Sequence, residues 1–177
     1  MSDLSVQYLS KDHRQCESVQ AELAFLLEAL DHGAPWSFSC AEQFENVCCF
    51  YRGVVLAHIR KEEEVFFPVL EAYLPRDTGP LAVLRGEHRE ICAFFERLCE
   101  ISRSLTPGER GTSALEEFMH KGRALGRLVG DHLYKEDRVL FPMVARFLSP
   151  DRDARLLEEM QAIGAEETVR CGTAAAI

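Results

Sequence analysis

The 177-residue sequence contains no long hydrophobic run, and none of its apolar stretches approaches the roughly 18 residues that a membrane-spanning helix needs. We therefore expect no membrane partner. Residues 1–11 lack the apolar core of a secretory signal, so the expected location is the cytoplasm. Positive charge is also scarce, because 20 Lys and Arg residues stand against 29 Asp and Glu residues and leave a net charge of −9. Since nucleic-acid binding needs clustered cations, we expect no nucleic-acid partner.

The seven cysteines include no Cys-x2-Cys pair, and the adjacent Cys48 and Cys49 have the wrong spacing for a zinc ribbon. An odd number of cysteines cannot pair completely within one chain, and a chain without a signal peptide is expected to keep its thiols reduced. Most of these residues are therefore predicted to pack as small buried hydrophobic side chains.

The apolar pattern is helical along most of the chain, and no segment has the pattern of a strand. Leucines at 23, 26, 27 and 30 recur at intervals of three and four residues. Capping boxes that begin at Ser39 and Ser113 mark two helix starts, and Pro68 and Pro142 fall inside the helices that follow, with a kink expected at Pro68. These signals predict helices at about 10–31, 39–74, 81–104, 113–148 and 150–163.

Four long helices with short connections predict an all-α fold, an up-down-up-down four-helix bundle with a short fifth helix at the C-terminus. The length is that of one domain, so we expect a single domain over 1–177 with its core at about 10–148. Segment 149–177 is expected to hold the fifth helix and, from Gly164, a frayed tail.

The two halves of the chain repeat each other. Asp12-His13-Arg14 recurs 75 residues later as Glu87-His88-Arg89. The segment His-Ile-Arg-Lys-Glu-Glu-Glu-Val-Phe-Phe-Pro at 58–68 recurs 74 residues later as His-Leu-Tyr-Lys-Glu-Asp-Arg-Val-Leu-Phe-Pro at 132–142. Each half is therefore predicted to form one helical hairpin, with a histidine on its first helix and a His-x3-Glu pair on its second.

The His-x3-Glu pairs are predicted to face the core. Each pair spans four residues and so lies on one helix face. Apolar residues at helical intervals place that face inside: Phe44, Val47, Tyr51, Val54 and Val55 before His58, and Phe118, Leu125, Leu128 and Val129 before His132. Buried carboxylates need compensating positive charge, which a pair of metal ions supplies. The predicted metal-site residues are His13, His58, Glu62, His88, His132 and Glu136.

These residues resemble the hemerythrin-like family, also called HHE cation-binding domains. The resemblance covers about 10–148 and is carried by His13, by His58 and Glu62 before Val-Phe-Phe-Pro, by His88, and by His132 and Glu136 before Val-Leu-Phe-Pro. It implies a four-helix bundle holding two non-heme iron ions bridged by oxygen or hydroxide. By this resemblance Glu62 and Glu136 bridge the ions and the four histidines are terminal ligands. Manganese accepts the same kinds of ligand.

Two positions depart from the oxygen-carrying hemerythrins. Those proteins have His-x3-His on the third helix, where this chain has Cys92 after His88. They also end with His-x4-Asp, whereas Glu136 follows His132 by four residues. Asp137 stands at the other spacing, but about 500° of helical rotation turns it away from His132, so Glu136 is preferred. The missing histidine leaves an open coordination position, which favours chemistry on a bound ligand over reversible oxygen carriage.

Three further side chains are candidates for contact with the metal site. Glu17, four residues after His13, is a possible ligand or hydrogen-bond acceptor for a ligand histidine. Tyr51, two turns before His58, is either a hydrogen-bond donor to a bound oxidant or a core residue. Cys92 is a thiolate ligand, a redox group or a packing residue.

Other polar and small residues are expected to have ordinary structural roles. His32 and His120 are predicted to lie on the surface, and the charged run at 61–64 is predicted to be solvated except for Glu62. Three glycines of the fourth long helix, at 122, 126 and 130, indicate close helix packing or a passage for a small ligand.

The expected function is that of a cytoplasmic di-iron protein that binds or processes oxygen, nitric oxide or peroxide, or buffers iron, during oxidative or nitrosative stress. The alternative is a di-iron oxidase or oxygenase with a small organic substrate held near Tyr51 and Leu125. A sensor is disfavoured because 177 residues leave no room for an output domain. The iron–sulfur repair members of the family carry an extra N-terminal domain with cysteines, whereas about ten residues precede the first predicted helix here. The expected partner is a small diatomic molecule or a peroxide, and no oligomeric state is predicted.

Overall fold

The computed structural model describes residues 3–144 and 146–174, and none of these residues lies in a strand. The expected all-α class is therefore confirmed. The elements, where η marks a π-helical turn, are α1 (Leu4–Asp31), α2 (Phe38–Phe50), η1 (Tyr51–Val55), α3 (Leu56–Lys61), η2 (Glu62–Phe66), α4 (Phe67–Leu70), α5 (Gly79–Ser104), α6 (Ser113–Lys135), η3 (Glu136–Leu140), α7 (Phe141–Val144) and α8 (Pro150–Ala174).

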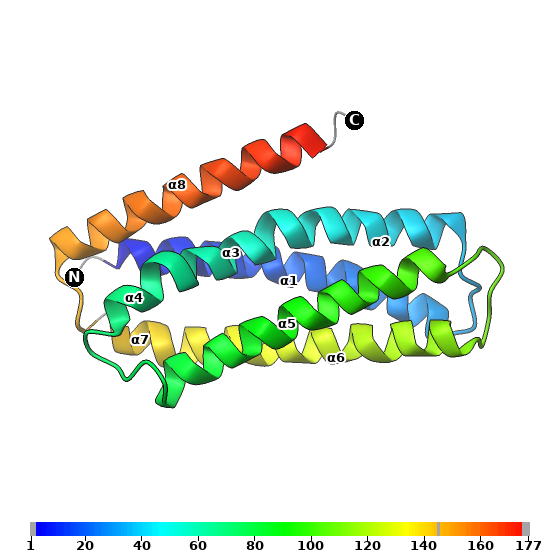
Figure 1. The fold of residues 1–177 in the computed structure, drawn as a ribbon, viewed down its shortest axis with the longest axis horizontal. Coiled ribbons are helices and arrows are strands. Elements are labelled where there is room, and N and C mark those ends of the chain that lie inside the picture. Colours follow the sequence, from blue (N-terminus) through cyan, green and yellow to red (C-terminus); the bar gives the residue numbers. More distant parts are fainter. Residues whose placement is uncertain (1–2, 145, 175–177) are drawn as a thin grey trace.

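Four long helices form the bundle (Figure 1). The first is α1, the second runs without a break from α2 through η1, α3 and η2 to α4, the third is α5, and the fourth runs from α6 through η3 to α7. Successive long helices run in opposite directions, which confirms the up-down-up-down bundle. The remaining helix, α8, lies outside the bundle against α1 and α3.

The predicted fifth helix is present, but it continues past the expected end near Ile163 and reaches Ala174. Its inner face carries Leu156, Met160 and Ile163 at helical spacing, and these side chains are buried. The expected frayed tail is thus helical over 164–174, while 175–177 lie outside the described residues.

The start of α1 differs from the prediction because a residue from a distant part of the chain caps this helix. The helix begins at Leu4 rather than near residue 10. A carboxylate from α8 caps it, because the side chain of Asp153 accepts hydrogen bonds from the backbone N–H groups of Leu4 at 2.7 Å and Ser5 at 3.0 Å. This cap comes from a residue almost 150 positions away, so no local pattern indicates it.

Two other helix starts are each displaced from the predicted capping serine. Ser37, rather than Ser39, caps α2, and its Oγ accepts a hydrogen bond from the Cys40 N–H at 3.1 Å. Thr112, rather than Ser113, caps α6 through the Leu115 N–H at 3.3 Å. Both caps have extended backbones, as the position requires.

The two prolines inside the long helices follow π-helical turns. η2 and η3 occupy matching places in the repeat, and each starts at the glutamate of a His-x3-Glu pair. Proline lacks an N–H and its ring crowds the carbonyl four residues earlier, which a widened turn relieves. The disturbance expected at Pro68 therefore takes the form of a wider turn that also positions Glu62.

The hydrophobic core is divided into two clusters. One surrounds Trp36, Phe44, Phe95 and Phe118, toward the end of the bundle where α1 leads into α2. The other surrounds Phe66, Phe67, Phe141 and Met160, toward the opposite end. On each long helix the predicted ligand residues stand between residues of the first cluster and residues of the second, so a layer of buried polar groups lies between two apolar regions.

Candidate metal centre

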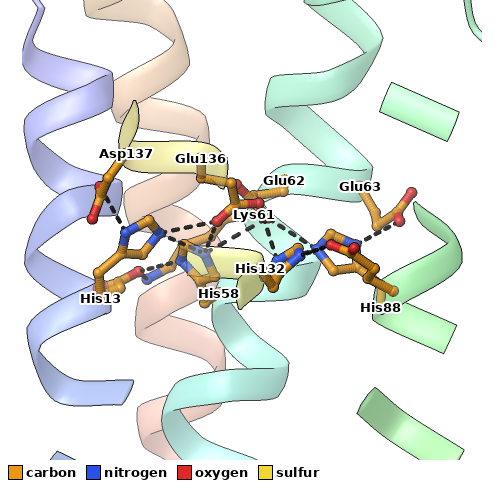
Figure 2. A network of polar contacts seen from close by, with 11 residues as sticks. His13, His58, Lys61, Glu62, Glu63, His88, His132, Glu136 and Asp137 are labelled. Atoms are coloured by element: carbon orange, nitrogen blue, oxygen red, sulfur yellow. Dashed lines mark hydrogen bonds and ion pairs between the residues drawn. The ribbon is translucent and has the colours of Figure 1, made fainter. Parts of the chain in front are cut away.

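The structure brings all six predicted ligand residues together from the four long helices (Figure 2). His13 comes from α1, His58 from α3, His88 from α5 and His132 from α6, while Glu62 and Glu136 begin the π turns η2 and η3. Each histidine is 2% exposed and each glutamate 0%. Helical spacing thus predicted the inward face of the two His-x3-Glu pairs, whereas His13 and His88 were predicted from the repeat and the family resemblance.

The four histidines form two pairs, one from each half of the repeat. The Nε2 atoms of His13 and His58 are 3.2 Å apart, and those of His88 and His132 are 3.1 Å apart. Both pairs have their rings edge to face, at 72° and 66°. Nitrogen lone pairs that converge in this way are typical of imidazoles that share a cation.

The two glutamates lie between the histidine pairs. Glu136 reaches both, with Oε2 3.1 Å from His13 Nε2 and Oε1 3.1 Å from His132 Nε2. Glu62 Oε2 lies 3.2 Å from His88 Nε2 and 3.6 Å from His58 Nε2. Each carboxylate therefore contacts a histidine of both halves, which is the placement that a bridging ligand requires.

Among the described residues, none of the four carboxylate oxygens of Glu62 and Glu136 has a hydrogen-bonding partner of acceptable geometry. Buried carboxylates without such partners are unfavourable by several kcal/mol unless positive charge compensates them. The possible donor atoms form two groups, each within 4.8 Å: Glu62, His88, His132 and Glu136 in one, and His13, His58 and Glu136 in the other. Oxygen and imidazole donors arranged in this way fit two cations.

The pKa values within the cluster show how the groups influence each other. Burial by itself lowers the pKa of His58, but the Glu62 charge and the contacts with Asp12 and Glu136 raise it well above its ordinary value. Burial by itself also lowers the pKa of His88, but the contacts with Glu62 and Glu63 raise it to about 9. Burial raises the pKa of Glu136, whereas the histidines around it hold the value well below the ordinary one. The raised pKa values of His58 and His88 favour protonated imidazoles beside the carboxylates, and a metal ion would replace those protons.

A second ring of carboxylates faces the outer nitrogen of each histidine. Nδ1 of His13 lies 2.9 Å from Asp137 and Nδ1 of His88 lies 2.8 Å from Glu63. In the same way, His132 Nδ1 lies 3.0 Å from Glu87, while His58 Nδ1 is 3.6 Å from Asp12, beyond hydrogen-bond reach. Such partners orient an imidazole so that Nε2 points toward a metal.

This ring also follows the internal repeat. Asp12 and Glu87 each precede a histidine, and Glu63 and Asp137 each follow a glutamate of the inner cluster. Two lysines at matching positions complete it: Lys61 donates to Asp12 at 2.7 Å, and Lys135 donates to Glu87. The expectation that 61–64 is solvated apart from Glu62 is wrong, because Lys61 is buried and Glu63 binds His88. The signal available in the sequence was the recurrence of these charges beside the predicted ligands.

The three candidate neighbours of the site lie in different surroundings. Tyr51 is 2% exposed, stacks on Phe95 at 4.0 Å, and its hydroxyl has no partner among the described residues. Cys92 is half-buried and lines a surface groove beside Phe95. Glu17 is exposed on α1, and the carboxylate that contacts His13 Nδ1 is that of Asp137.

The remaining sequence expectations near the site have mixed outcomes. His32 and His120 are exposed, as predicted. At Gly122 a Cβ would lie 2.8 Å from Leu27, which supports close packing, whereas Gly130 has open space. Two surface grooves lie between α1 and α6 beside these glycines. One, of about 410 Å³, is lined by Gly122 and Gly126, and the other by Gly126 and Gly130.

None of the helices in the described part of the chain combines the length and apolarity of a membrane span.

Comparison with known proteins identifies the family of this chain. The hemerythrin HHE cation-binding domain matches residues 4–144 and, in an overlapping match, residues 81–166.

Similar proteins include those named iron–sulfur cluster repair protein YtfE from Salmonella typhimurium, Salmonella newport and Salmonella agona, each 28% identical over 90 residues. The matched region covers 49% of this chain and 40% of each relative, so this chain spans less than half the length of those proteins. The family match covers most of the chain and agrees with the inward histidines and glutamates of the bundle. The chain therefore belongs to the hemerythrin HHE cation-binding domain family.

Proposed function

We propose that this chain is a non-heme di-iron protein that binds or processes oxygen, nitric oxide or peroxide, or buffers iron. The observation that carries the proposal is the pair of fully buried glutamates whose oxygens lack hydrogen bonds and lie between four inward imidazole nitrogens. Iron fits this donor set, and manganese is the other metal that the same donors accept.

The proposed ligands are His13, His58, His88, His132, Glu62 and Glu136. Two histidines and the shared carboxylates would hold each ion, which leaves coordination positions for a small exogenous ligand. Bound iron would supply Lewis acidity and electron transfer to that ligand. The outer carboxylates would keep the imidazoles of His13, His88 and His132 in the tautomer and orientation that present Nε2 to the ion.

Metal analysis of the iron-supplied protein tests this proposal. We expect about two ions per chain by elemental analysis, with an absorption spectrum that distinguishes iron from manganese. His58→Ala and His132→Ala should lose most of the metal, whereas the exposed His120→Ala is the matched control on α6. A content below about half an ion per chain would contradict the proposed site. Adding nitric oxide or peroxide and following the spectrum then tests ligand binding.

The similarity to proteins named for iron–sulfur cluster repair favours a second candidate function, in which the chain donates its iron to a damaged cluster. The loaded protein would be mixed with a cluster-free iron–sulfur protein and sulfide, and recovery of the cluster absorbance would be followed. His58→Ala should be inactive. Equal recovery with free ferrous iron at the same concentration would argue against a donor role.

The oxidase or oxygenase alternative receives less support. Tyr51 and Leu125, the positions expected beside an organic substrate, are 2% and 1% exposed. The main surface grooves over the described residues are lined by other side chains.

A further inference from the structure

Two cysteines outside the metal centre lie in contact with each other. Cys48 on α2 and Cys99 on α5 place their Sγ atoms 3.5 Å apart, although they are 51 positions apart in sequence. They are 2% and 7% exposed. A disulfide has an S–S length of about 2.0 Å, so a movement of about 1.5 Å would bring the sulfurs to bonding distance.

One member of this pair faces a surface groove. Cys99 lines a groove of about 390 Å³ together with Arg52 and Arg103. The Arg52 guanidinium lies 5.8 Å from the centre of the Phe95 ring, over the same groove. Cys48 is not among the side chains that line this groove, and it is less exposed than Cys99. A small oxidant entering from solvent would therefore meet Cys99 first.

The electrostatic surroundings also distinguish the two thiols, and again Cys99 is the more reactive one. The pKa of Cys99 falls to about 7, mainly through its contact with the Cys48 thiol; burial opposes this fall, and the charges of Arg52 and Arg103 add to it. The contact with Cys99 and burial raise the pKa of Cys48. The thiolate is the reactive form of cysteine, so Cys99 is the nucleophile and Cys48 the resolving thiol.

We propose that Cys48 and Cys99 form a reversible disulfide when the chain meets a peroxide. The Cys99 thiolate attacks one peroxide oxygen, the O–O bond breaks, and the departing hydroxide takes a proton to become water. Cys99 is then a sulfenic acid. The Cys48 sulfur attacks the Cys99 sulfur, the S–O bond breaks as the S–S bond forms, and the Cys48 proton leaves in a second water. The two thiols lose two electrons and the peroxide gains them.

The disulfide would join the two halves of the bundle. Cys48 belongs to the first hairpin and Cys99 to the second, so the bond would tie α2 to α5. Cys48 precedes His58 by ten residues and Cys99 follows His88 by eleven, which at about 1.5 Å per residue places both sulfurs about 15 Å along the bundle from the histidines. The reaction uses only thiols and does not depend on the proposed metal function.

The experiment treats the full-length chain with stoichiometric hydrogen peroxide while a chelator suppresses metal-driven oxidation. Remaining thiols are alkylated, and the protein is mapped by mass spectrometry. We expect a loss of about 2 Da, protection of Cys48 and Cys99 from alkylation, a peptide pair joined through these residues, and recovery with dithiothreitol. In Cys48→Ser, Cys99 should give a sulfenic acid that dimedone traps. Cys99→Ser should consume peroxide at least tenfold more slowly than the wild-type chain.

Cys49→Ser is the matched control, because Cys49 is adjacent to Cys48 but exposed. This variant should form the same disulfide at the wild-type rate. The proposal is overturned if peroxide leaves Cys48 and Cys99 open to alkylation while it oxidises other cysteines. It is also overturned if Cys99→Ser reacts as fast as the wild-type chain, or if Cys49 supplies the linked sulfur.

Discussion

At the scale of single residues, the candidate metal centre consists of two concentric layers of side chains. The inner layer presents Nε2 and carboxylate oxygens to a common region, and the outer layer holds the Nδ1 atoms. Lysines at matching positions of the repeat neutralise two of the outer carboxylates. The outer layer therefore adjusts both the direction and the basicity of the proposed ligands.

Loss of an outer carboxylate should weaken metal binding without removing a ligand. We expect Glu87→Gln to lower the metal affinity by about 10- to 100-fold, because His132 loses its charged Nδ1 partner. Competition with a chromogenic chelator measures this change. Glu90→Gln, an exposed glutamate on the same helix, is the control. Equal affinities for the two variants would show that the outer carboxylate has no role in binding.

The pKa shifts predict how the metal-free protein responds to pH. His88 has a folded pKa of about 9 against an ordinary 6.5, so its contribution to stability is complete below pH 6.5 and is lost as pH rises toward 9. Glu136 has a depressed pKa, so its contribution is present above its ordinary 4.5 and is lost as pH falls through the folded value.

Thermal unfolding of the metal-free chain should accordingly show its highest Tm between pH 4.5 and 6.5 and a decline toward pH 9. Metal replaces the imidazole protons, so the loaded chain should keep its stability at the higher pH. A metal-free Tm that rises from pH 6.5 to 9 would be inconsistent with protonated histidines in the cluster.

At the scale of helices, irregular turns and close approaches determine where side chains lie. The π turns η2 and η3 precede the prolines and begin at the two inner glutamates. A third π turn, η1, begins at Tyr51 and has no counterpart in α6. On α6, three glycines spaced by four residues lie beside α1, but only Gly122 is tightly enclosed by it.

Alanine substitutions should separate these glycines. Gly130→Ala should stabilise the protein by about 0.5–1 kcal/mol, because alanine favours a helix and a Cβ meets open space. Gly122→Ala should give no gain or a loss of about 1–3 kcal/mol, since its Cβ would lie 2.8 Å from the buried Leu27 side chain. Urea unfolding measures both values. A similar gain from both variants would exclude a packing role for Gly122.

At the scale of the whole molecule, α8 breaks the symmetry of the repeat. It packs against α1 and α3, and Lys61 beneath it has a side chain that is 6% exposed. Lys135, at the matching position of the second half, is 42% exposed. The two halves thus carry the same ion pair in different surroundings, one buried and one in contact with solvent.

The two lysines should differ in their contribution to stability. Lys61→Met leaves Asp12 buried without its cation and should cost about 3–5 kcal/mol of unfolding free energy. Lys135→Met removes a partly exposed pair and should cost about 0–1 kcal/mol. Chemical denaturation of both variants under the same metal-free conditions checks the difference. Equal costs would mean that the cover provided by α8 does not alter the energetics of the pair.

The inward-facing His-x3-Glu pairs, the helical class and the order of the long helices could all be predicted, because they depend on short-range spacing. A His-x3-Glu pair on an apolar stripe must face the core of its own helix, and the repeat doubles that signal. The helix starts were predicted less accurately, because Ser37 and Ser39 can both cap a helix and the backbone geometry decides between them. The single-domain expectation and the two-ion stoichiometry stay predictions.

Interactions between distant segments could not be predicted in this way. The sequence by itself determined which side chains point inward and that they occur in two matching sets. Only the tertiary structure decided that Asp137 pairs with His13 across 124 positions, that Asp153 caps α1, and that Cys48 meets Cys99. The physical reason is that helical periodicity fixes the direction in which a side chain points around the axis of its own helix. Contacts between helices depend instead on how several helix axes pack against each other and on which face of the bundle α8 covers.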